Sequence, residues 1–187
     1  MKTKRLLSML LIASLVPLSA LAGTWQDPET KVNYYYTVGN SEASVAGGNY
    51  STAGSPDVTG DISILSTFSI DGNEYTVTKI SSYAFSGCTL MYTVTIPSSV
   101  TEIGDYAFSD CSGLESVTIT SSITSIGRSA FSDCTGLESV TLSEGLTSIG
   151  EYAFKNCTGL ELVFIPSSVT NIGGSAFQNC TGMTTLT

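Results

Sequence analysis

The amino-acid sequence predicts an α/β solenoid, in which 23-residue coils, each with a parallel β-strand and a short helical turn, stack behind a β-rich N-terminal cap. Three observations predict it: an Ala-Phe pair, a cysteine and an isoleucine each recur five times with a constant period of 23. Such a repeat can bury its apolar residues only when successive coils stack on one another. The pairs are Ala84-Phe85, Ala107-Phe108, Ala130-Phe131, Ala153-Phe154 and Ala176-Phe177; the cysteines are Cys88, Cys111, Cys134, Cys157 and Cys180; the isoleucines are Ile80, Ile103, Ile126, Ile149 and Ile172.

The strand of each coil is predicted by an alternating pattern. In LESVTI, from Leu114 to Ile119, the first, fourth and sixth residues are apolar. Because side chains alternate between the two faces of a strand, Val117 and Ile119 are expected to face the core, while Ser116 and Thr118 face outward. A period of 23 also lies within the roughly 20 to 29 residues of leucine-rich repeats, in which each coil contributes one strand.

The second half of the coil has a helical spacing. In SAFSDCTGL, Ala130, Phe131, Cys134 and Leu137 fall at positions i, i+1, i+4 and i+7. This spacing predicts the buried face of a short helical segment. Gly136 lies near its end, where we expect an exit with positive φ.

The five cysteines are predicted to be packing residues. Each falls on the buried side of the helical segment, where a small and weakly polar side chain fits below the phenylalanine of the same coil. Disulfides between neighbouring coils are sterically conceivable in an oxidising compartment, but five is an odd number and an unbroken ladder favours free, buried thiols. The chain contains no histidine and no Cys-x-x-Cys pair, so a zinc site is disfavoured, and we expect no metal or other cofactor.

Residues 1–22 have the features of a secretory signal peptide. Three basic residues precede an apolar run from Leu6 to Val16, and Ala20-Leu21-Ala22 resembles the pattern after which signal peptidases cut. The apolar run is shorter than the roughly 20 residues that cross a bilayer, so a membrane anchor is the weaker alternative. We therefore expect a secreted or cell-surface protein with no membrane insertion after signal removal.

The charge of the chain disfavours two classes of partner. Without residues 1–22, four basic residues face sixteen acidic ones, a formal charge of −12. Nucleic acids and anionic lipids are bound mainly through Lys and Arg, so neither is an expected partner. A negative surface most simply maintains solubility, although it also suits basic partners or cations.

The repeat unit resembles a known family. The stretches LESVTITSSITSIGRSAFSDC and VFIPSSVTNIGGSAFQNC are similar to the BspA-like leucine-rich repeats of bacterial surface proteins, and the resemblance covers about Ile80 to Thr187. Pro97 and Pro166 keep the proline that follows the strand in this family, whereas Thr120 and Ser143 do not. The resemblance implies an arc-shaped solenoid used for adhesion or protein binding at the cell surface.

The two ends of the mature chain differ from the repeats. Residues 23–78 are expected to form the cap, with several strand-like stretches and a hairpin at Asp71-Gly72-Asn73, and residues 79–187 the solenoid. The last coil stops at GMTTLT without a covering segment. We expect a C-terminal truncation, the alternative being an exposed edge that associates end to end with another chain.

Candidate binding residues lie on the outward positions of the strands. Most of these positions are small and hydroxylated, including Thr118 and Thr141, but the fourth strand presents Leu162 and Phe164 together. Neighbouring exposed apolar residues are typical binding anchors, so both are predicted to contact a partner, unless a cap or a further segment covers them.

A row of carboxylates is expected beside this face. Glu115, Glu138 and Glu161 recur at the 23-residue interval and would stack about 5 Å apart. Their mutual repulsion could be relieved by a basic partner or a cation, but side chains that splay into water are the favoured interpretation.

The residues that carry common enzyme chemistry are missing from the sequence. Without histidine, no Ser-His-Asp or Cys-His device can form, and no phosphate-binding loop or nucleophile elbow is present. We therefore predict a non-enzymatic protein that binds an extracellular or host protein, with a glycan as a further ligand class. The alternatives are a structural spacer that displays another domain and, less favoured, a carbohydrate-binding accessory.

Overall fold

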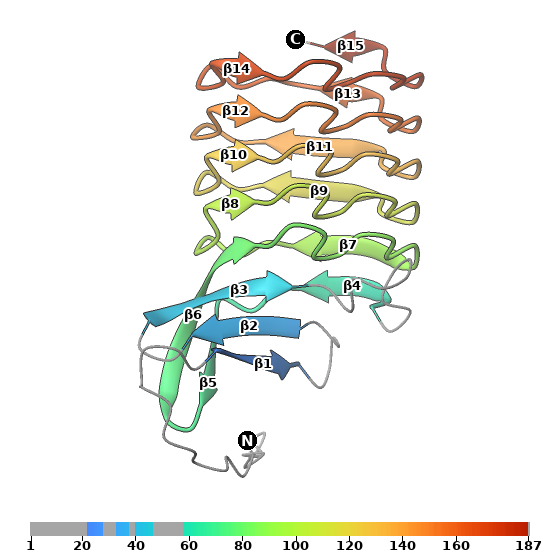
Figure 1. Ribbon diagram of the computed structural model, residues 1–187. Coiled ribbons are helices and arrows are strands. Elements are labelled where there is room, and N and C mark those ends of the chain that lie inside the picture. Colours follow the sequence, from blue (N-terminus) through green and yellow to red (C-terminus); the bar gives the residue numbers. More distant parts are fainter. Residues whose placement is uncertain (1–21, 28–32, 38–39, 47–57, 187) are drawn as a thin grey trace, which may run out of the picture.

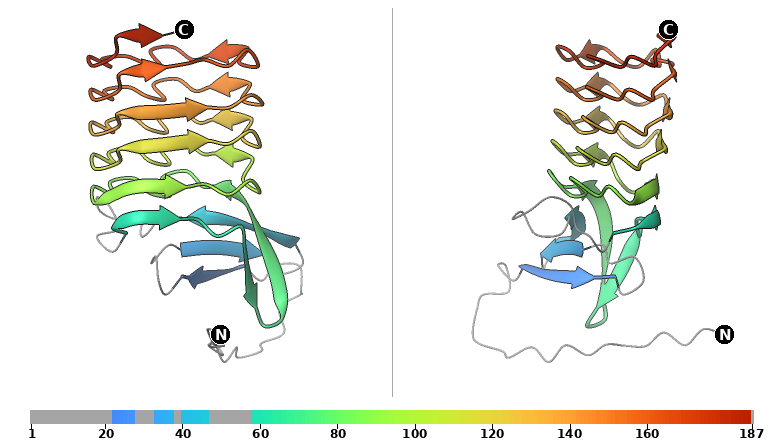
Figure 2. Two further views of the ribbon diagram at one scale, coloured as in Figure 1. Left: turned by 180° about the vertical axis from the view of Figure 1, so that it is seen from behind. Right: turned by 90° about the vertical axis from the view of Figure 1, so that its right-hand side faces the viewer.

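The chain winds into a stack of coils that rises in sequence order toward the C-terminus, as the computed structural model shows (Figure 1). The structure describes residues 22–27, 33–37, 40–46 and 58–186. Residues 1–21, which hold almost all of the predicted signal peptide, lie outside this part. Two β-sheets form opposite sides of the stack, as the turned views show (Figure 2).

One sheet joins the cap to the solenoid. Its nine strands follow the order β1-β2-β3-β6-β8-β10-β12-β14, with β5 paired to β6. The cap strands β1, β2 and β3 pair antiparallel with one another. From the pairing of β3 with β6 onward, every pair on this path is parallel. The bounds are β1 (Ala22–Gln26), β2 (Asn33–Thr37), β3 (Asn40–Ala46), β5 (Thr67–Ile70), β6 (Asn73–Ile80), β8 (Glu102–Ile103), β10 (Ser125–Ile126), β12 (Ser148–Ile149) and β14 (Asn171–Ile172).

The other sheet lies across the core from the first. Its six strands are all parallel, in the order β15-β13-β11-β9-β7-β4. Their bounds are β4 (Gly60–Ser63), β7 (Met91–Thr95), β9 (Ser116–Ile119), β11 (Ser139–Leu142), β13 (Leu162–Val163) and β15 (Thr185–Leu186).

The predicted coil period and strand orientation are confirmed. Val117 pairs with Val94 on one side and Val140 on the other, each exactly one repeat away in the sequence. Val117 and Ile119 are buried and Thr118 is exposed, as the alternation predicts. The parallel pairing of in-register strands therefore places the same repeat position of every coil in one row.

The predicted helical turn is wrong, since the described residues contain no helix. The segment between the two strands consists of consecutive turns, with positive φ at Tyr106 (57°) and Asp110 (60°). Backbone N–H groups alternate their partners: Phe108 donates to Ala130 of the next coil, while Ser109 donates to Tyr106 three residues back. The i, i+1, i+4 spacing suits such a turn as well as a helix. Carbonyl groups of the neighbouring coil accept the backbone hydrogen bonds that a helix would have made within itself.

The predicted positive φ at Gly136 is also wrong; only Gly60, Gly72, Gly87 and Gly145 among the described glycines have it. Gly136 is required instead by close contact between coils. A Cβ at this position would lie 2.5 Å from the carbonyl oxygen of Ser112 in the preceding coil. The glycine therefore sets how closely two coils approach.

Phenylalanines and cysteines form two parallel ladders in the core. The rings of Phe85, Phe108, Phe131, Phe154 and Phe177 stack with centroids 5.0 to 5.3 Å apart and nearly parallel planes. All five cysteines are buried thiols without disulfides. The Cys134 Sγ donates to the carbonyl of Phe108 at 3.1 Å, and Cys111, Cys157 and Cys180 make the equivalent bond to Phe85, Phe131 and Phe154. The predicted packing role of the cysteines is thus extended by a hydrogen bond to a backbone carbonyl of the preceding coil.

The cap merges with the stack of coils. The predicted hairpin joins β5 to β6, with positive φ at both Asp71 and Gly72. This pair of positive φ values matches the right-handed twist of the hairpin strands. Strand β6 continues past the expected boundary at residue 78 and pairs with β8, while β4 pairs with β7. The coil-like pairing therefore begins within the region that the sequence assigned to the cap.

A glycine substitution tests the contact between coils. Gly136→Ala is expected to lower the free energy of unfolding by about 2 kcal/mol or more, because its Cβ meets backbone that cannot move independently. Gly174→Ala is the matched control: no atom lies within 4 Å of its Cβ, so its effect should stay within about 0.5 kcal/mol. Urea unfolding followed by circular dichroism measures both. Equal effects of the two substitutions would contradict the contact.

Thiol reactivity tests the cysteine ladder. Cys180 is 8% exposed, whereas Cys111, Cys134 and Cys157 are 0% exposed. The neighbouring side chain of Cys157 also lowers the pKa of Cys180. In the native protein at neutral pH, we expect a thiolate-specific reagent to modify Cys180 first and the other three only at the rate of unfolding. Mass spectrometry of timed samples, with a urea-unfolded control, measures the order; uniform modification of native thiols would contradict it.

Candidate partner-binding face

The sequence-predicted binding residues gather on one side of the solenoid. We call this surface the strand face and define it as the outward side chains of β7, β9, β11 and β13, the glutamates that directly precede the last three of these strands, and Phe164. Thr93, Ser116, Ser139 and Leu162 share one row, because each is paired with the next. Thr118 and Thr141 are paired in a second row. Phe164 directly follows β13 and lies beyond its paired residues.

The two predicted anchors are exposed. Leu162 is 41% and Phe164 63% accessible to solvent, while Val163 between them is fully buried. Because side chains alternate along a strand, Leu162 and Phe164 both point outward while Val163 points into the core. The buried Val163 anchors the backbone between them. The corresponding residues of the two preceding coils are serine and threonine, so the anchors rise from a floor of small hydroxylated side chains.

The predicted glutamate row is present. The backbone N–H of Glu138 donates to the carbonyl of Glu115 at 2.9 Å, and that of Glu161 donates to Glu138 at 3.3 Å. All three side chains are exposed. No group of three or more Asp, Glu, Cys or His side chains in the described part is placed to hold a metal ion.

Sequence reasoning missed an aromatic residue in this row. Tyr92 accepts the backbone N–H of Glu115 at its carbonyl, at 2.9 Å, and therefore occupies the row of the glutamates in the first of the four coils. Its side chain is 48% exposed, and Leu90, two positions earlier, is 53% exposed. The signal was available in the sequence, because Tyr92 lies exactly one repeat before Glu115 and replaces the glutamate there.

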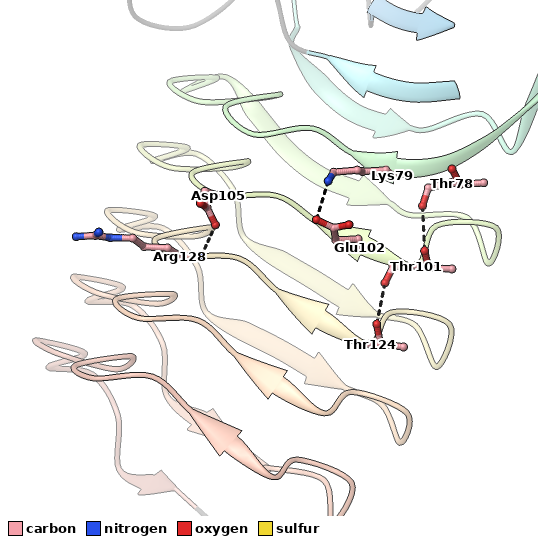
Figure 3. Close-up of polar contacts among 7 residues, drawn as sticks. All are labelled: Thr78, Lys79, Thr101, Glu102, Asp105, Thr124 and Arg128. Atoms are coloured by element: carbon pink, nitrogen blue, oxygen red, sulfur yellow. Dashed lines mark hydrogen bonds and ion pairs between the residues drawn. The ribbon is translucent and has the colours of Figure 1, made fainter. Parts of the chain in front are cut away.

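The strand face is negatively charged. Asp61 on β4 accepts a hydrogen bond from Thr93 at 2.8 Å and adds a carboxylate beside β7. The basic side chains of the described residues lie elsewhere. Lys79 on β6 pairs with Glu102 at 2.7 Å, as Figure 3 shows, and Arg128 and Lys155 lie over the ring of Tyr152. No described cation therefore neutralises the carboxylates of the strand face.

Hydrogen bonds of polar side chains connect neighbouring coils in the opposite sheet and its turns. The Thr101 hydroxyl donates to the Thr78 carbonyl at 3.3 Å, and the Thr124 hydroxyl to Thr101 at 3.4 Å (Figure 3). The Asp105 carboxylate accepts the backbone N–H of Arg128 at 2.8 Å. These polar groups bond to the neighbouring coil and so stabilise the stack.

Two carboxyl groups with shifted pKa lie in turns between strands. The backbone N–H of Ser167 and further groups of Ser167 and Ser168 lower the pKa of Glu144. Partial burial and then the Asp133 carboxylate raise the pKa of Asp110. Both shifts arise from contacts between neighbouring coils, which gives them a structural origin.

The Asp110 shift makes stability depend on pH. A carboxyl group whose pKa is raised by folding destabilises the fold when ionised, and this cost disappears as the pH falls through its folded pKa. Asp133 already accepts a hydrogen bond from Asn156 at 2.7 Å, and Asn156 from Asn179 at 2.9 Å, so an amide at position 110 would extend that ladder.

We therefore expect Asp110→Asn to stabilise the protein by at most about 0.5 kcal/mol at pH 7, since it removes repulsion between neighbouring like charges that solvent partly screens. The gain should vanish in acid, where Asp110 is protonated. Asp105→Asn, which weakens a charge-assisted bond to Arg128, should give no gain. Urea unfolding between pH 3 and pH 7 (about the range in which aspartate titrates) measures both, and a gain that is constant with pH would contradict the assignment.

The fold and the row-by-row placement of side chains define a leucine-rich repeat solenoid. The family model for the BspA type leucine rich repeat region matches residues 63–184 in six copies, so the chain belongs to this family. The predicted family membership is thereby confirmed. No curated protein sequence matches the chain.

Solved structures of bacterial leucine-rich repeat proteins are similar to this one. A leucine-rich repeat protein from Bacteroides ovatus is 34% identical, with a TM-score of 0.73 over 83% of this chain and 39% of that one. The leucine-rich repeat protein of T. pallidum is 26% identical, with a TM-score of 0.67 over 88% and 67%. A leucine rich cell surface protein from Faecalibacterium prausnitzii shares the fold at 24% identity and a TM-score of 0.52, over 88% and 54%. The chain thus spans 39% of the length of the Bacteroides protein.

Among the described residues, no helical segment has the length and hydropathy of a membrane span.

Proposed function

We propose that this chain is an exported, non-enzymatic repeat protein that binds other macromolecules at the cell surface through the strand face. The observation that carries the proposal is the exposure of Leu162 and Phe164 on either side of the buried Val163. The equivalent positions of the two preceding coils hold only serine and threonine. Large apolar side chains exposed together on a rigid sheet are typical contact anchors. Thr118, Thr141 and the three glutamates would supply the polar surroundings of the contact.

Two further features support this function. Residues 1–22 have the charge and apolar pattern of a signal peptide, which favours export. The BspA-type repeats belong to a class of solenoid proteins whose repeated surfaces present extended areas for binding rather than catalytic pockets. The proposed partner is an extracellular or host protein, with a glycan as the second ligand class.

The last coil favours a second, separate contact. Ile172 of β14 is 47% exposed, whereas the equivalent Ile149 of the preceding coil is fully buried. An apolar coil edge of this kind can pair with another chain, so end-to-end association is a further proposal. The alternative to binding through the strand face is a structural spacer that displays another domain. A spacer has no partner on this face, so its function would not depend on Leu162 and Phe164.

Substitution of the anchors distinguishes a binding module from a spacer. Leu162→Ser combined with Phe164→Ser is expected to weaken binding of a partner, captured from a panel of purified extracellular proteins and glycans, by at least about tenfold. Biolayer interferometry measures the affinity. Tyr83→Ser is the matched control, because it removes a large side chain of similar exposure from a turn outside the strand face.

Circular dichroism and urea unfolding establish that each variant is folded. Unchanged capture by the folded double variant would contradict binding through the strand face and favour the spacer.

A further inference from the structure

We propose that the strand face binds an extended, basic peptide segment that carries two apolar side chains, one held at Tyr92 and the other at Leu162 and Phe164. This inference rests on the proposed function, since it names the partner of the same face. It adds Tyr92 as a second anchor and specifies the spacing and charge of what is bound.

The large apolar side chains of the strand face occur at its two ends. Tyr92 and the neighbouring Leu90 belong to the coil of β7, whereas Leu162 and Phe164 belong to the coil of β13. Between them, β9 and β11 present small hydroxylated side chains, namely Ser116, Thr118, Ser139 and Thr141. A ligand that uses both ends must therefore cross the strands over a shallow floor.

The distance between the ends selects the length of the ligand. Three strand spacings separate β7 from β13, which corresponds to about 14 Å. An extended peptide rises about 3.4 Å per residue, so side chains four positions apart span this distance and point to the same side. The residue midway between them also faces the sheet. Stacked phenylalanines with centroids about 5 Å apart and inter-coil hydrogen bonds keep the spacing constant.

The charge of the face selects the composition of the ligand. Asp61, Glu115, Glu138 and Glu161 lie on or beside it, while the described Lys79, Arg128 and Lys155 lie on the other sheet or in turns. A lysine or arginine between the two apolar residues of the ligand would meet this row of carboxylates. The floor hydroxyls can hydrogen-bond the peptide backbone.

The same charges disfavour two other occupants. A second copy of the chain in face-to-face contact would bring like charges together without a described cation to neutralise them. A neutral glycan could stack on Tyr92 or Phe164, but it would leave the carboxylates without a complement. A basic peptide with apolar side chains is the occupant that can both contact the exposed apolar residues and pair with the carboxylates of the strand face.

A fluorescein-labelled peptide, Gly-Ser-Trp-Ser-Lys-Ser-Leu-Ser-Gly, is the probe. It is compared with an analogue that has Glu in place of Lys and with one of the same composition in which Trp and Leu are adjacent. Fluorescence anisotropy measures affinity. The wild-type chain is expected to bind the first peptide at least about tenfold more tightly than either analogue, and added salt should weaken this binding.

Variants of the protein locate the site. Tyr92→Ser, and Leu162→Ser combined with Phe164→Ser, should each weaken binding by at least about tenfold, and Glu115→Gln combined with Glu138→Gln by about threefold to tenfold. Tyr83→Ser and Glu151→Gln are the matched controls, since both residues are exposed and lie in turns outside the strand face. The controls should bind as the wild type does, and circular dichroism verifies that every variant is folded.

Equal binding of the lysine peptide and both analogues, or no binding of any of them, would overturn the inference. If partner capture still depends on Leu162 and Phe164 in that case, the proposed function stands with another kind of ligand. If neither the peptide nor the captured partner responds to these two substitutions, both proposals are overturned. Binding of a glycan that depends on Tyr92, without any binding of the peptide, would also overturn the inference.

Discussion

The in-register contact between neighbouring coils is the interaction on which the rest of the structure depends. Each coil donates and accepts backbone hydrogen bonds to and from the coils on either side, along both sheets and through the turns between them. The phenylalanine rings of successive coils stack with centroids about 5 Å apart, close to the spacing of paired strands. Neighbouring coils also approach so closely at Gly136 that no side chain would fit there. A coil by itself has too small a core to be stable, so stability comes from the sum of these contacts.

This constraint also determines the strand face. Because parallel strands pair without a shift from β9 to β11, a residue type that recurs in every repeat becomes a straight row on the surface. Repetition produces the rows of threonine and glutamate, and departures from repetition produce the individual features. Tyr92 departs from the glutamate row, and Leu162 from the row of Thr93, Ser116 and Ser139. Residues that break the repeat on an exposed face have no packing role that would explain them, which makes them the informative positions for binding.

Much of the structure followed from the sequence, and the errors share one cause. The period, the strand alternation, the buried cysteines and the hairpin at Asp71-Gly72 were predicted correctly because each rests on a local pattern or on strict recurrence. The helical turn and the positive φ of Gly136 were wrong because both assumed that a segment satisfies its hydrogen bonds within itself. In the structure, Phe108 donates to Ala130 in the neighbouring coil instead.

The sequence by itself determined that the repeats stack as coils, which residues of each coil are buried, and which face carries Leu162 and Phe164. It could do so because periodicity and alternation are properties of the chain. The tertiary structure alone decided that turns replace the helix and that the cysteine thiols bond to phenylalanine carbonyls. These features depend on which atoms of the neighbouring coil lie within about 3 Å, a distance that appears only when the coils are stacked.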